Sequence, residues 1–388
     1  MAKEKQIQQE STDEELIRQK KRMPRWLGIT LRVVIITFVS VILIAAGYLL
    51  YVVISYSRIP DNQVLDVNQR ASYEETGNVN LYTEYTIVTQ NIGFGAYTQD
   101  FTFFMDGGKE SWAKSKESVI DCINQGMQKI TSFNPDFVVI QEIDFDSTRS
   151  YHTDQRDIIN PYFENYSYDF AVNYHSAFLM YPFSQPHGAS KSGIETLSRF
   201  PIESAIRRSL PISTSFSKFL DLDRCYSKTK IPTSNGKYLV IYNAHLSAYG
   251  NDDAIREGQM RMLFGDMQEE YDAGNYCICG GDFNHDFTGD SVEKINGRND
   301  VSSLGWAQPF PYAILAEYMG IKRCIEYNND ELLPTCRNCD IPYKVGNFTI
   351  IVDGFLVSAN VQVNSLENVQ TDFVYSDHNP VVMKFILM

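Results

Sequence analysis

Two patterns of apolar residues divide the chain into a short N-terminal part and a long remainder. Val33–Ile54 is a run of 22 residues without a charged side chain, and about 20 apolar residues span a bilayer as a helix. Beyond residue 80, short apolar runs alternate with stretches in which apolar residues recur at helical spacing. The first pattern predicts a transmembrane helix, and the second is typical of an α/β body.

Strands and helices alternate along the predicted body. Helical spacing indicates one helix at about residues 112–130 and a second that carries Met260, Leu263, Phe264 and Met267 on one face. Short runs rich in β-branched and aromatic residues are typical of buried strands. We therefore expect an α/β (α+β) fold in which mixed sheets pack face to face with helices outside. The expected strands are Tyr82–Thr89, Phe137–Ile140, Tyr238–Asn243, Tyr276–Cys279, Phe348–Phe355 and Val381–Ile386.

Basic residues predict the direction in which the apolar segment crosses the membrane. Lys20, Lys21, Arg22, Arg25 and Arg32 all precede it, and basic flanks stay on the cytoplasmic side. We therefore expect a single-pass protein of the cell membrane with a cytoplasmic N-terminus and an extracellular catalytic body. A cleaved signal peptide is the alternative, but both the apolar run and the segment before it are long for one.

These features predict four segments. They are a cytoplasmic tail at 1–32, a transmembrane helix at 33–54, a polar linker at 55–80 and a catalytic domain at 81–388.

Charge is distributed unevenly between the tail and the body. The formal net charge is −14, and residues 1–32 carry a local charge of +3, which leaves −17 on the rest of the chain. Such an acidic body does not attract a polyanion broadly. A bound divalent cation reverses the sign locally, so a substrate that contains phosphate stays compatible with this charge.

Seven cysteines leave their chemistry open. The number is odd, so at least one thiol is free or pairs between chains. Plain free cysteines are one interpretation, and a local disulfide that involves Cys324, Cys336 or Cys339 is another. A metal site at the Cys336–Cys339 CxxC motif is the third, but no second pair has suitable spacing for zinc.

Polar residues follow or interrupt the expected strands at six places. Rigid strands can direct such groups into one cleft. Asp353 interrupts a very apolar run, where an unpaired carboxylate is costly and needs a partner. The six places are Gln90-Asn91, Gln141-Glu142, Asn243-Ala244-His245, Gly281-Asp282-Phe283-Asn284, Asp353 and Ser376-Asp377-His378.

The residue types at these places suit phosphoryl chemistry. Oxygen ligands such as Glu142 and Asp377, with Asn91 nearby, favour Mg²⁺ or Mn²⁺ over zinc. Such an ion stabilises charge on a phosphoryl oxygen.

Five further residues have the chemistry to act on the phosphate and the attacking water. Asp282 could orient or deprotonate the water, and Asn284 could donate a hydrogen bond to the phosphate. Asp353 could orient His378 as in other Asp–His pairs, and His245 offers a second imidazole.

In this order, the motifs resemble the endonuclease/exonuclease/phosphatase superfamily. Its members include pancreatic deoxyribonuclease, apurinic endonucleases, neutral sphingomyelinases and inositol-polyphosphate phosphatases. The resemblance covers about residues 82–388. It rests on the six places above, extended to Leu246, Phe355 and Pro380, together with Leu197-Ser-Arg-Phe-Pro-Ile202 and Arg256-Glu-Gly-Gln259.

This resemblance implies a four-layer α/β sandwich and assigns roles to the candidate residues. Glu142 would hold a divalent metal with Asn91 and Asp377 near it. Asp282 and Asn284 would contact the attacking water and the phosphate, Asp353 and His378 would form a pair, and His245 would match a second histidine.

The resemblance matches four other residues less closely. Glu195 lies where some members carry a carboxylate that partners the second histidine. Tyr174 and Tyr181 are candidates for the tyrosine of some nucleases, and we expect Arg199 to be structural.

Two functions fit these expectations, a metal-dependent hydrolase of phosphodiesters and a non-catalytic surface protein on the same fold. Every expected catalytic position holds a competent residue, which favours the enzyme. Membrane tethering and the aromatic stretches Phe101–Phe104 and Tyr181–Phe183 slightly favour phospholipid headgroups such as sphingomyelin, although such aromatics also serve as core or loop packing. An extracellular nuclease and a hydrolase of other phosphate esters are the alternatives, and the sequence indicates no protein partner.

Overall fold

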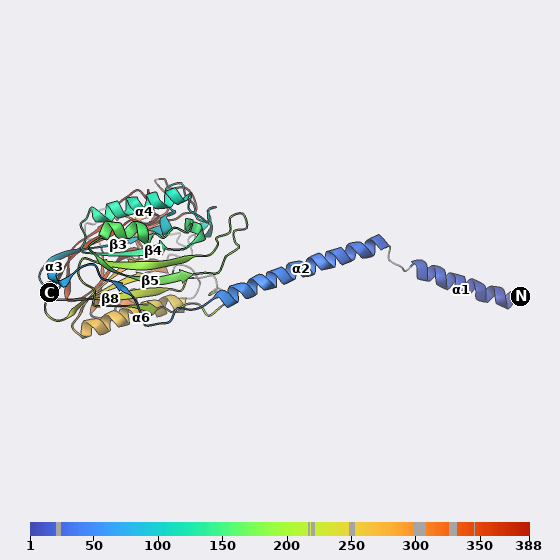
Figure 1. The fold of residues 1–388 in the computed structure, drawn as a ribbon, viewed down its shortest axis with the longest axis horizontal. Helices are drawn as coiled ribbons and strands as arrows, with labels where there is room; N and C mark the ends of the chain where they lie inside the picture. The colour runs from blue at the N-terminus through green and yellow to red at the C-terminus, as the bar shows by residue number, and fades with distance from the viewer. Residues whose placement is uncertain are drawn as a thin grey trace. The chain divides into compact units, whose positions relative to one another are not determined.

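The computed structural model forms two compact units, Met1–Ser55 and Tyr56–Met388 (Figure 1). It describes residues 1–20, 25–215, 218, 222–247, 253–297, 308–325, 332–344 and 346–388.

The first unit consists of two helices. Helix α1 (Ala2–Lys20) covers most of the expected polar tail, and α2 (Arg25–Ser55) contains the apolar run. Helix α2 begins eight residues before the predicted span because the basic flank continues the helix, and Thr30 Oγ1 donates to the Trp26 carbonyl at 2.9 Å. By length and composition, α2 is able to cross a membrane.

The second unit contains two seven-stranded sheets. The first has the order β1 (Gln63–Val64), β7 (Ser204–Ser209), β8 (Cys225–Pro232), β9 (Tyr238–His245), β10 (Tyr276–Asp282), β16 (Asp353–Ser358) and β13 (Ile321–Cys324). The second has the order β17 (Val361–Asn368), β18 (Val381–Leu387), β3 (Glu84–Asn91), β4 (Phe137–Asp144), β6 (Lys191–Ser198), β5 (Ser167–His175) and β2 (Val67–Asn68). The strand expected at Phe348–Phe355 is divided between β15 (Thr349–Ile350) and the start of β16.

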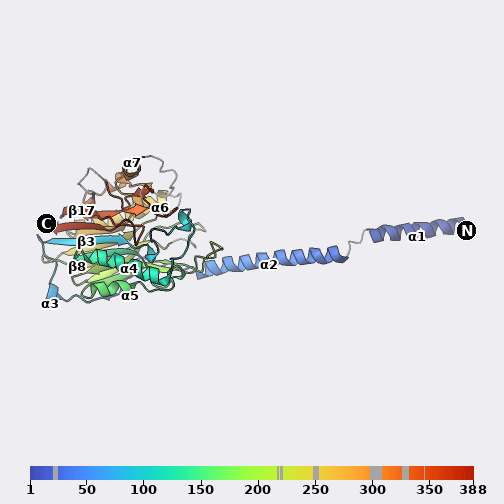
Figure 2. The same ribbon diagram turned by 90° about the horizontal axis from the view of Figure 1, so that it is seen from above.

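Helices cover the outer faces of the two sheets. Helix α4 (Lys116–Thr131) packs on the sheet that contains β3, and α6 (Asp253–Asp272) packs on the sheet that contains β10 (Figure 1). Figure 2 shows α4 beside α5 (Arg156–Ile159), with α7 (Ser291–Asn296) on the other side of the unit. The expected sandwich of two sheets between helices is therefore confirmed.

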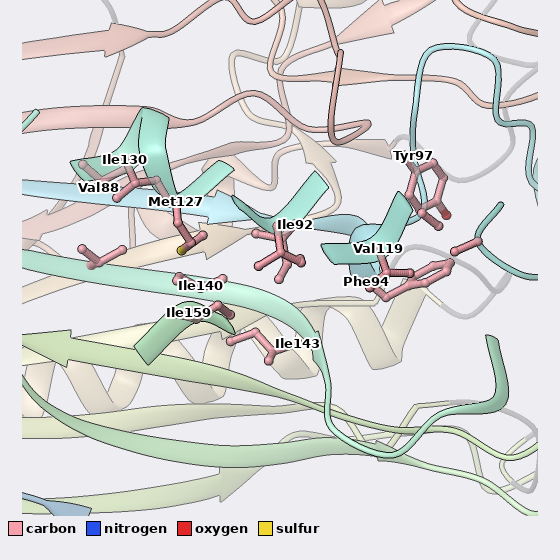
Figure 3. Close-up of a cluster of buried hydrophobic side chains, with 14 of the residues drawn as sticks. Val88, Ile92, Phe94, Tyr97, Val119, Met127, Ile130, Ile140, Ile143 and Ile159 are labelled. Carbon is pink, nitrogen blue, oxygen red and sulfur yellow. The ribbon is translucent and has the colours of Figure 1, made fainter. Parts of the chain in front are cut away.

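Alternation along the strands divides the apolar residues among the layers. Ile87 and Val139 point into the core between the sheets, whereas Val88 and Ile140 point outward under α4. In Figure 3, Met127 of α4 lies with Val88 and Ile140 in this outer cluster. The period of two in each strand thus builds two different apolar layers.

Part of the interface between the sheets is polar. Thr229 Oγ1 donates to Asp169 Oδ2 at 2.6 Å, and Gln141 Nε2 donates to Asn243 Oδ1 at 2.8 Å. The Asn243 amide then donates to the Glu195 carbonyl at 2.8 Å in the opposite sheet. These bonds satisfy buried polar groups, and their directionality fixes how one sheet lies on the other.

Residues 63–79 are part of the second unit, although the sequence led us to expect a linker at 55–80. Strands β1 and β2 pair with β7 and β5, one in each sheet. Leu65, Ala71 and Val79 are buried, and Ser72 caps the short helix α3 (Tyr73–Thr76). The stretch is mostly polar in composition, which predicted a linker. Its few apolar residues nevertheless pack against the body.

Two buried carboxyl groups make stability sensitive to pH. Burial raises the pKa of Glu195 to about 8 and that of Asp169 to about 7. Because the folded protein binds these protons more tightly than the unfolded chain, stability is full below about pH 4. It falls as pH rises toward 8, by up to about 1.4 kcal/mol per pH unit for each group.

The double variant Glu195→Gln/Asp169→Asn is expected to lose most of this pH dependence between pH 5 and 8. Thermal unfolding at several pH values measures it, and Glu367→Gln, at an exposed position, is the matched control. An unchanged slope in the double variant would contradict the assignment.

Candidate active site

Strand pairing places three of the expected residues in one row. His245 and Asp282 end the parallel strands β9 and β10 and are direct partners, and Asp353 begins β16 opposite Asp282. Parallel strands end at the same edge of a sheet, which is why two separate motifs meet here. All three side chains are buried.

Asp353 and His378 form the expected pair. The Asp353 Oδ2 atom lies 2.8 Å from His378 Nδ1, which leaves Nε2 directed toward Asp282 Oδ2 at 3.8 Å. Burial alone lowers the pKa of His378, but the charge of Asp353 and other nearby acidic groups raises it well above 6.5. The imidazole is thus held as a proton carrier that faces Asp282.

The segment before β18 is attached to the end of β3 by a serine. Ser376 Oγ donates to the Asn91 carbonyl at 2.9 Å and accepts from the His378 amide at 3.1 Å. Ser376 therefore fixes the backbone that carries Asp377 and His378 against the strand that carries Asn91.

His245 lies between two carboxylates. Its Nε2 atom is 3.6 Å from Asp282 Oδ2 and 3.8 Å from Glu142 Oε1, and Nδ1 has no hydrogen-bond partner among the described residues. Burial lowers the pKa of His245 well below 6.5, so the ring is neutral at pH 7.

Glu195 does not partner His245 in this structure. It lies two residues before Leu197, which packs in the outer layer under α4, so its side chain points to that same outer face.

Asn91 and Glu142 connect the second sheet to this row. Asn91 Nδ2 donates at 3.1 Å both to Glu142 Oε1 and to Asp282 Oδ2. The pairing of β4 with β6 is irregular between Ile140 and Ile143, and Glu142 has a φ of 60°. Such a bulge redirects a side chain, and here it turns Glu142 toward Asn91 and His245.

Asn284 is fixed next to Asp282. Its backbone amide donates to Asp282 Oδ1 at 2.8 Å, and its side-chain amide donates to the Leu246 carbonyl at 2.8 Å. The expected hydrogen bond from Asn284 to a phosphate therefore requires this side-chain amide to exchange partners or to donate a second hydrogen.

Asp377 is half-buried at the other side of Asn91. Burial, with a smaller contribution from the charge of Glu142, raises the pKa of Asp377 to about 7. A Cβ atom at Gly93 would lie 2.7 Å from Asp377 Oδ1, so glycine keeps that oxygen accessible. Asn91 Oδ1 accepts from the Gly93 amide at 2.9 Å on this side. The carboxylate oxygens of Glu142 and Asp377 are the kind of ligand that suits a hard divalent cation.

A second group of potential ligands lies beside the first. Ligand atoms of Asp282, Asp353 and His378 lie within 4.8 Å of one another, and all three residues are buried. In this group, however, His378 Nδ1 already contacts Asp353. The donor set of Glu142, Asp377 and Asn91 therefore fits a metal better, because it has carboxylate oxygens without a cationic partner among the described contacts.

Two arginines near the site had no signal in the sequence pattern. Arg224 precedes β8, and its buried Nε and Nη1 atoms have no partner among the described residues, while its charge helps to lower the pKa of His245. Arg149 pairs with Asp144 at 2.9 Å and lies 3.8 Å from the centre of the Phe94 ring. A lone arginine beside a strand is too common to be recognised from sequence.

The two candidates for a catalytic tyrosine, and the arginine expected to be structural, lie in different parts of the catalytic unit. Tyr174 is buried with its ring 5.7 Å from the Arg149 guanidinium, whereas Tyr181 is 65% exposed. Arg199 donates to Asn134 at 2.8 Å and pairs with Asp136 at the opposite ends of the strands, a structural location as expected.

The cysteines carry no disulfide, and all seven are free and buried. Two of them contact the site. Cys336 Sγ lies 3.6 Å from His378 Nε2, and Cys339 Sγ lies 3.9 Å from Asp377 Oδ2. The CxxC motif therefore helps to pack the site.

Comparisons with known proteins show a family match and a similar fold. The Endonuclease/Exonuclease/phosphatase family matches residues 88–378. An endonuclease/exonuclease/phosphatase from Beutenbergia cavernae DSM 12333 is 16% identical, with a TM-score of 0.53 over 78% of this chain and 72% of that chain. ANGEL2, a 2′,3′-cyclic phosphatase, is 14% identical, with a TM-score of 0.52 over 83% of this chain and 98% of that chain. A search of curated proteins finds no match.

The two packed sheets and the cluster at their strand ends define a phosphoesterase fold. The chain belongs to the endonuclease/exonuclease/phosphatase family. It is a hydrolase of phosphate esters that depends on a divalent metal. The expected enzyme class is thus confirmed, and the non-catalytic alternative is set aside.

Loss of the charge that orients His378 should reduce catalysis without unfolding the protein. Asp353→Asn is expected to lower kcat by about 10²–10⁴, the range for a lost acid–base contribution. The matched control is Asp136→Asn, which removes an ion pair with Arg199 away from the site. Steady-state kinetics and thermal unfolding of both variants test this, and a near-normal kcat in Asp353→Asn would refute the pairing role.

Proposed function

We propose that this protein is a membrane-anchored phosphodiesterase whose catalytic unit faces the outside of the cell. The observation that carries the catalytic part is the row of His245, Asp282 and Asp353 with His378 directed at Asp282. Helix α2 and the basic residues before it support the anchor and its orientation.

In this proposal, Glu142 and Asp377, with Asn91, hold Mg²⁺ or Mn²⁺. When bound, the ion supplies positive charge to a phosphoryl oxygen. The pKa of Asp282 is raised to about 6, mainly by burial, so this carboxylate is able to accept a proton from the attacking water near neutral pH.

The other site residues hold a proton or bind the phosphate. His378, oriented by Asp353, holds the proton that neutralises developing charge on an oxygen. Neutral His245 and the side-chain amide of Asn284 orient the phosphate as hydrogen-bond donors. Arg224 has two buried guanidinium nitrogens without a partner among the described residues, and a phosphate oxygen would satisfy them.

Phospholipid headgroups such as sphingomyelin are the favoured substrate class. A membrane anchor keeps the enzyme at a lipid surface, and the acidic body, with −17 outside residues 1–32, disfavours a long polyanion. An extracellular nuclease and a hydrolase of other phosphate esters are the competing outcomes of the test below.

The full chain in detergent is expected to hydrolyse a bis-aryl phosphodiester with Mg²⁺ or Mn²⁺ and to lose this activity with a chelator. Parallel assays on sphingomyelin, plasmid DNA and an inositol phosphate identify the substrate class, and sphingomyelin is expected to be turned over fastest. Asp282→Ala should be inactive, with Glu367→Gln as the control. Metal-independent activity, or faster cleavage of DNA, would contradict the proposal.

A further inference from the structure

An uncharged hairpin projects from the second sheet between β5 and β6. Its 15 residues, Ser176–Ser190, include no Lys, Arg, Asp or Glu. The one histidine, His187, is buried, and burial lowers its pKa to about 4, so it adds no charge at pH 7. Loops at protein surfaces are ordinarily polar, which makes this composition unusual.

The hairpin is an ordered structure. Leu179 and Gly188 exchange two backbone hydrogen bonds of 3.0 Å, and the Gln185 amide donates to the Pro182 carbonyl at 3.1 Å. Trp112 Nε1 donates to the Pro186 carbonyl at 2.7 Å and attaches the returning arm to the body. Its tip therefore has a defined direction.

Large apolar side chains at the tip are exposed. Phe183 is 83% exposed and Tyr181 is 65% exposed, and Met105 from a neighbouring segment is 53% exposed. Exposed apolar area is unfavourable relative to burial, and clustered exposure of this kind marks an interaction surface.

The hairpin begins where the polypeptide enters the catalytic unit. Asp223 Oδ2 accepts from the Ile59 amide at 2.7 Å and lies 3.8 Å from His175 Nε2, the last residue of β5. Only three residues, Tyr56–Arg58, lie between Ser55, the end of α2, and Ile59. The base of the hairpin therefore contacts the segment of the catalytic unit that directly follows α2 in the chain.

A continuous series of aromatic contacts connects the hairpin to the active site. Tyr97, whose ring packs against Gly93 beside Asp377, lies 6.0 Å from Phe103 between ring centres. The contacts continue from Phe103 to Phe104 at 4.9 Å and from Phe104 to Tyr181 at 5.9 Å. The tip and the proposed metal site therefore belong to the same end of the sandwich. Figure 3 shows Tyr97 beside Phe94 at this end of the core.

We propose that the tip of this hairpin, Phe178–Phe183, inserts into the interfacial layer of the bilayer and turns the active-site end of the catalytic unit toward the lipid headgroups. This inference rests on the proposed membrane anchor. The absence of charge and the presence of Tyr and Phe suit the interface of a lipid bilayer, where aromatic rings are favoured. A polar protein partner would favour charged groups, and the tip has none.

A spin label tests the insertion in the full chain. All seven native cysteines are buried, so Phe183→Cys provides a single accessible thiol. The control is Tyr82→Cys, which replaces an aromatic residue that is 73% exposed and precedes β3 at the end away from Asn91. In vesicles, the label at 183 is expected to collide several-fold more with oxygen, and several-fold less with a water-soluble nickel complex, than the label at 82.

Separate readouts distinguish failure of the hairpin from failure of the anchor. Resistance to carbonate extraction reports on the anchor, whereas label accessibility reports on the hairpin. Equal accessibility at positions 183 and 82 in an integrated chain overturns the proposal. A functional variant adds a second readout: Phe183→Ser is expected to slow hydrolysis of sphingomyelin in vesicles about tenfold and to leave hydrolysis of the soluble bis-aryl phosphodiester unchanged. Equal slowing on both substrates also overturns it.

Discussion

The close approach of the two sheets beside Gly280 is the constraint on which the site depends. A Cβ atom at this position would lie 2.7 Å from the Phe355 ring and 2.8 Å from Val139 in the opposite sheet. Interiors are packed too densely to absorb such an overlap, so glycine allows β10 to lie against β4. Two residues later, β10 delivers Asp282, which Asn91 of the opposite sheet contacts at 3.1 Å.

The same strand also requires an unusual backbone at Gly281. Its φ is 156°, and a Cβ atom there would lie 1.9 Å from the Ala244 carbonyl oxygen. The Gly-Gly-Asp sequence thus permits tight packing first and the catalytic carboxylate immediately afterward. The packing of the sheets and the position of the catalytic carboxylate therefore depend on the same two glycines.

Charge is the second determinant of the site. Several carboxylates converge at the strand ends, and burial raises the pKa of Asp282 to about 6 and that of Asp377 to about 7. Their mutual repulsion is costly in a buried environment unless cations compensate. His378 supplies part of this compensation beside Asp353, and the proposed metal supplies the rest beside Asp377. An acidic protein can therefore present a locally positive site to a phosphate.

The spacing of apolar residues along the chain predicted the layered fold, because it shows which face of each strand is buried. Polar residues that directly follow strands predicted that the six motifs meet, because strand ends lie together at the edge of a sheet. The pair of Asp353 and His378 followed from the high cost of a buried carboxylate. Features that arise from tertiary geometry were not accessible. The bulge that turns Glu142, the attachment of residues 63–79 and the location of Arg224 have no local signature in composition or period.

The central proposal is that Glu142 and Asp377 bind the metal, whereas Asp282 and His378 transfer protons. Anomalous diffraction from crystals of the full chain grown with Mn²⁺ tests it most directly. The account predicts a peak bounded by Glu142 and Asp377, with Asn91 adjacent and His378 unligated. A peak ligated instead by Asp282, Asp353 and His378 would contradict it.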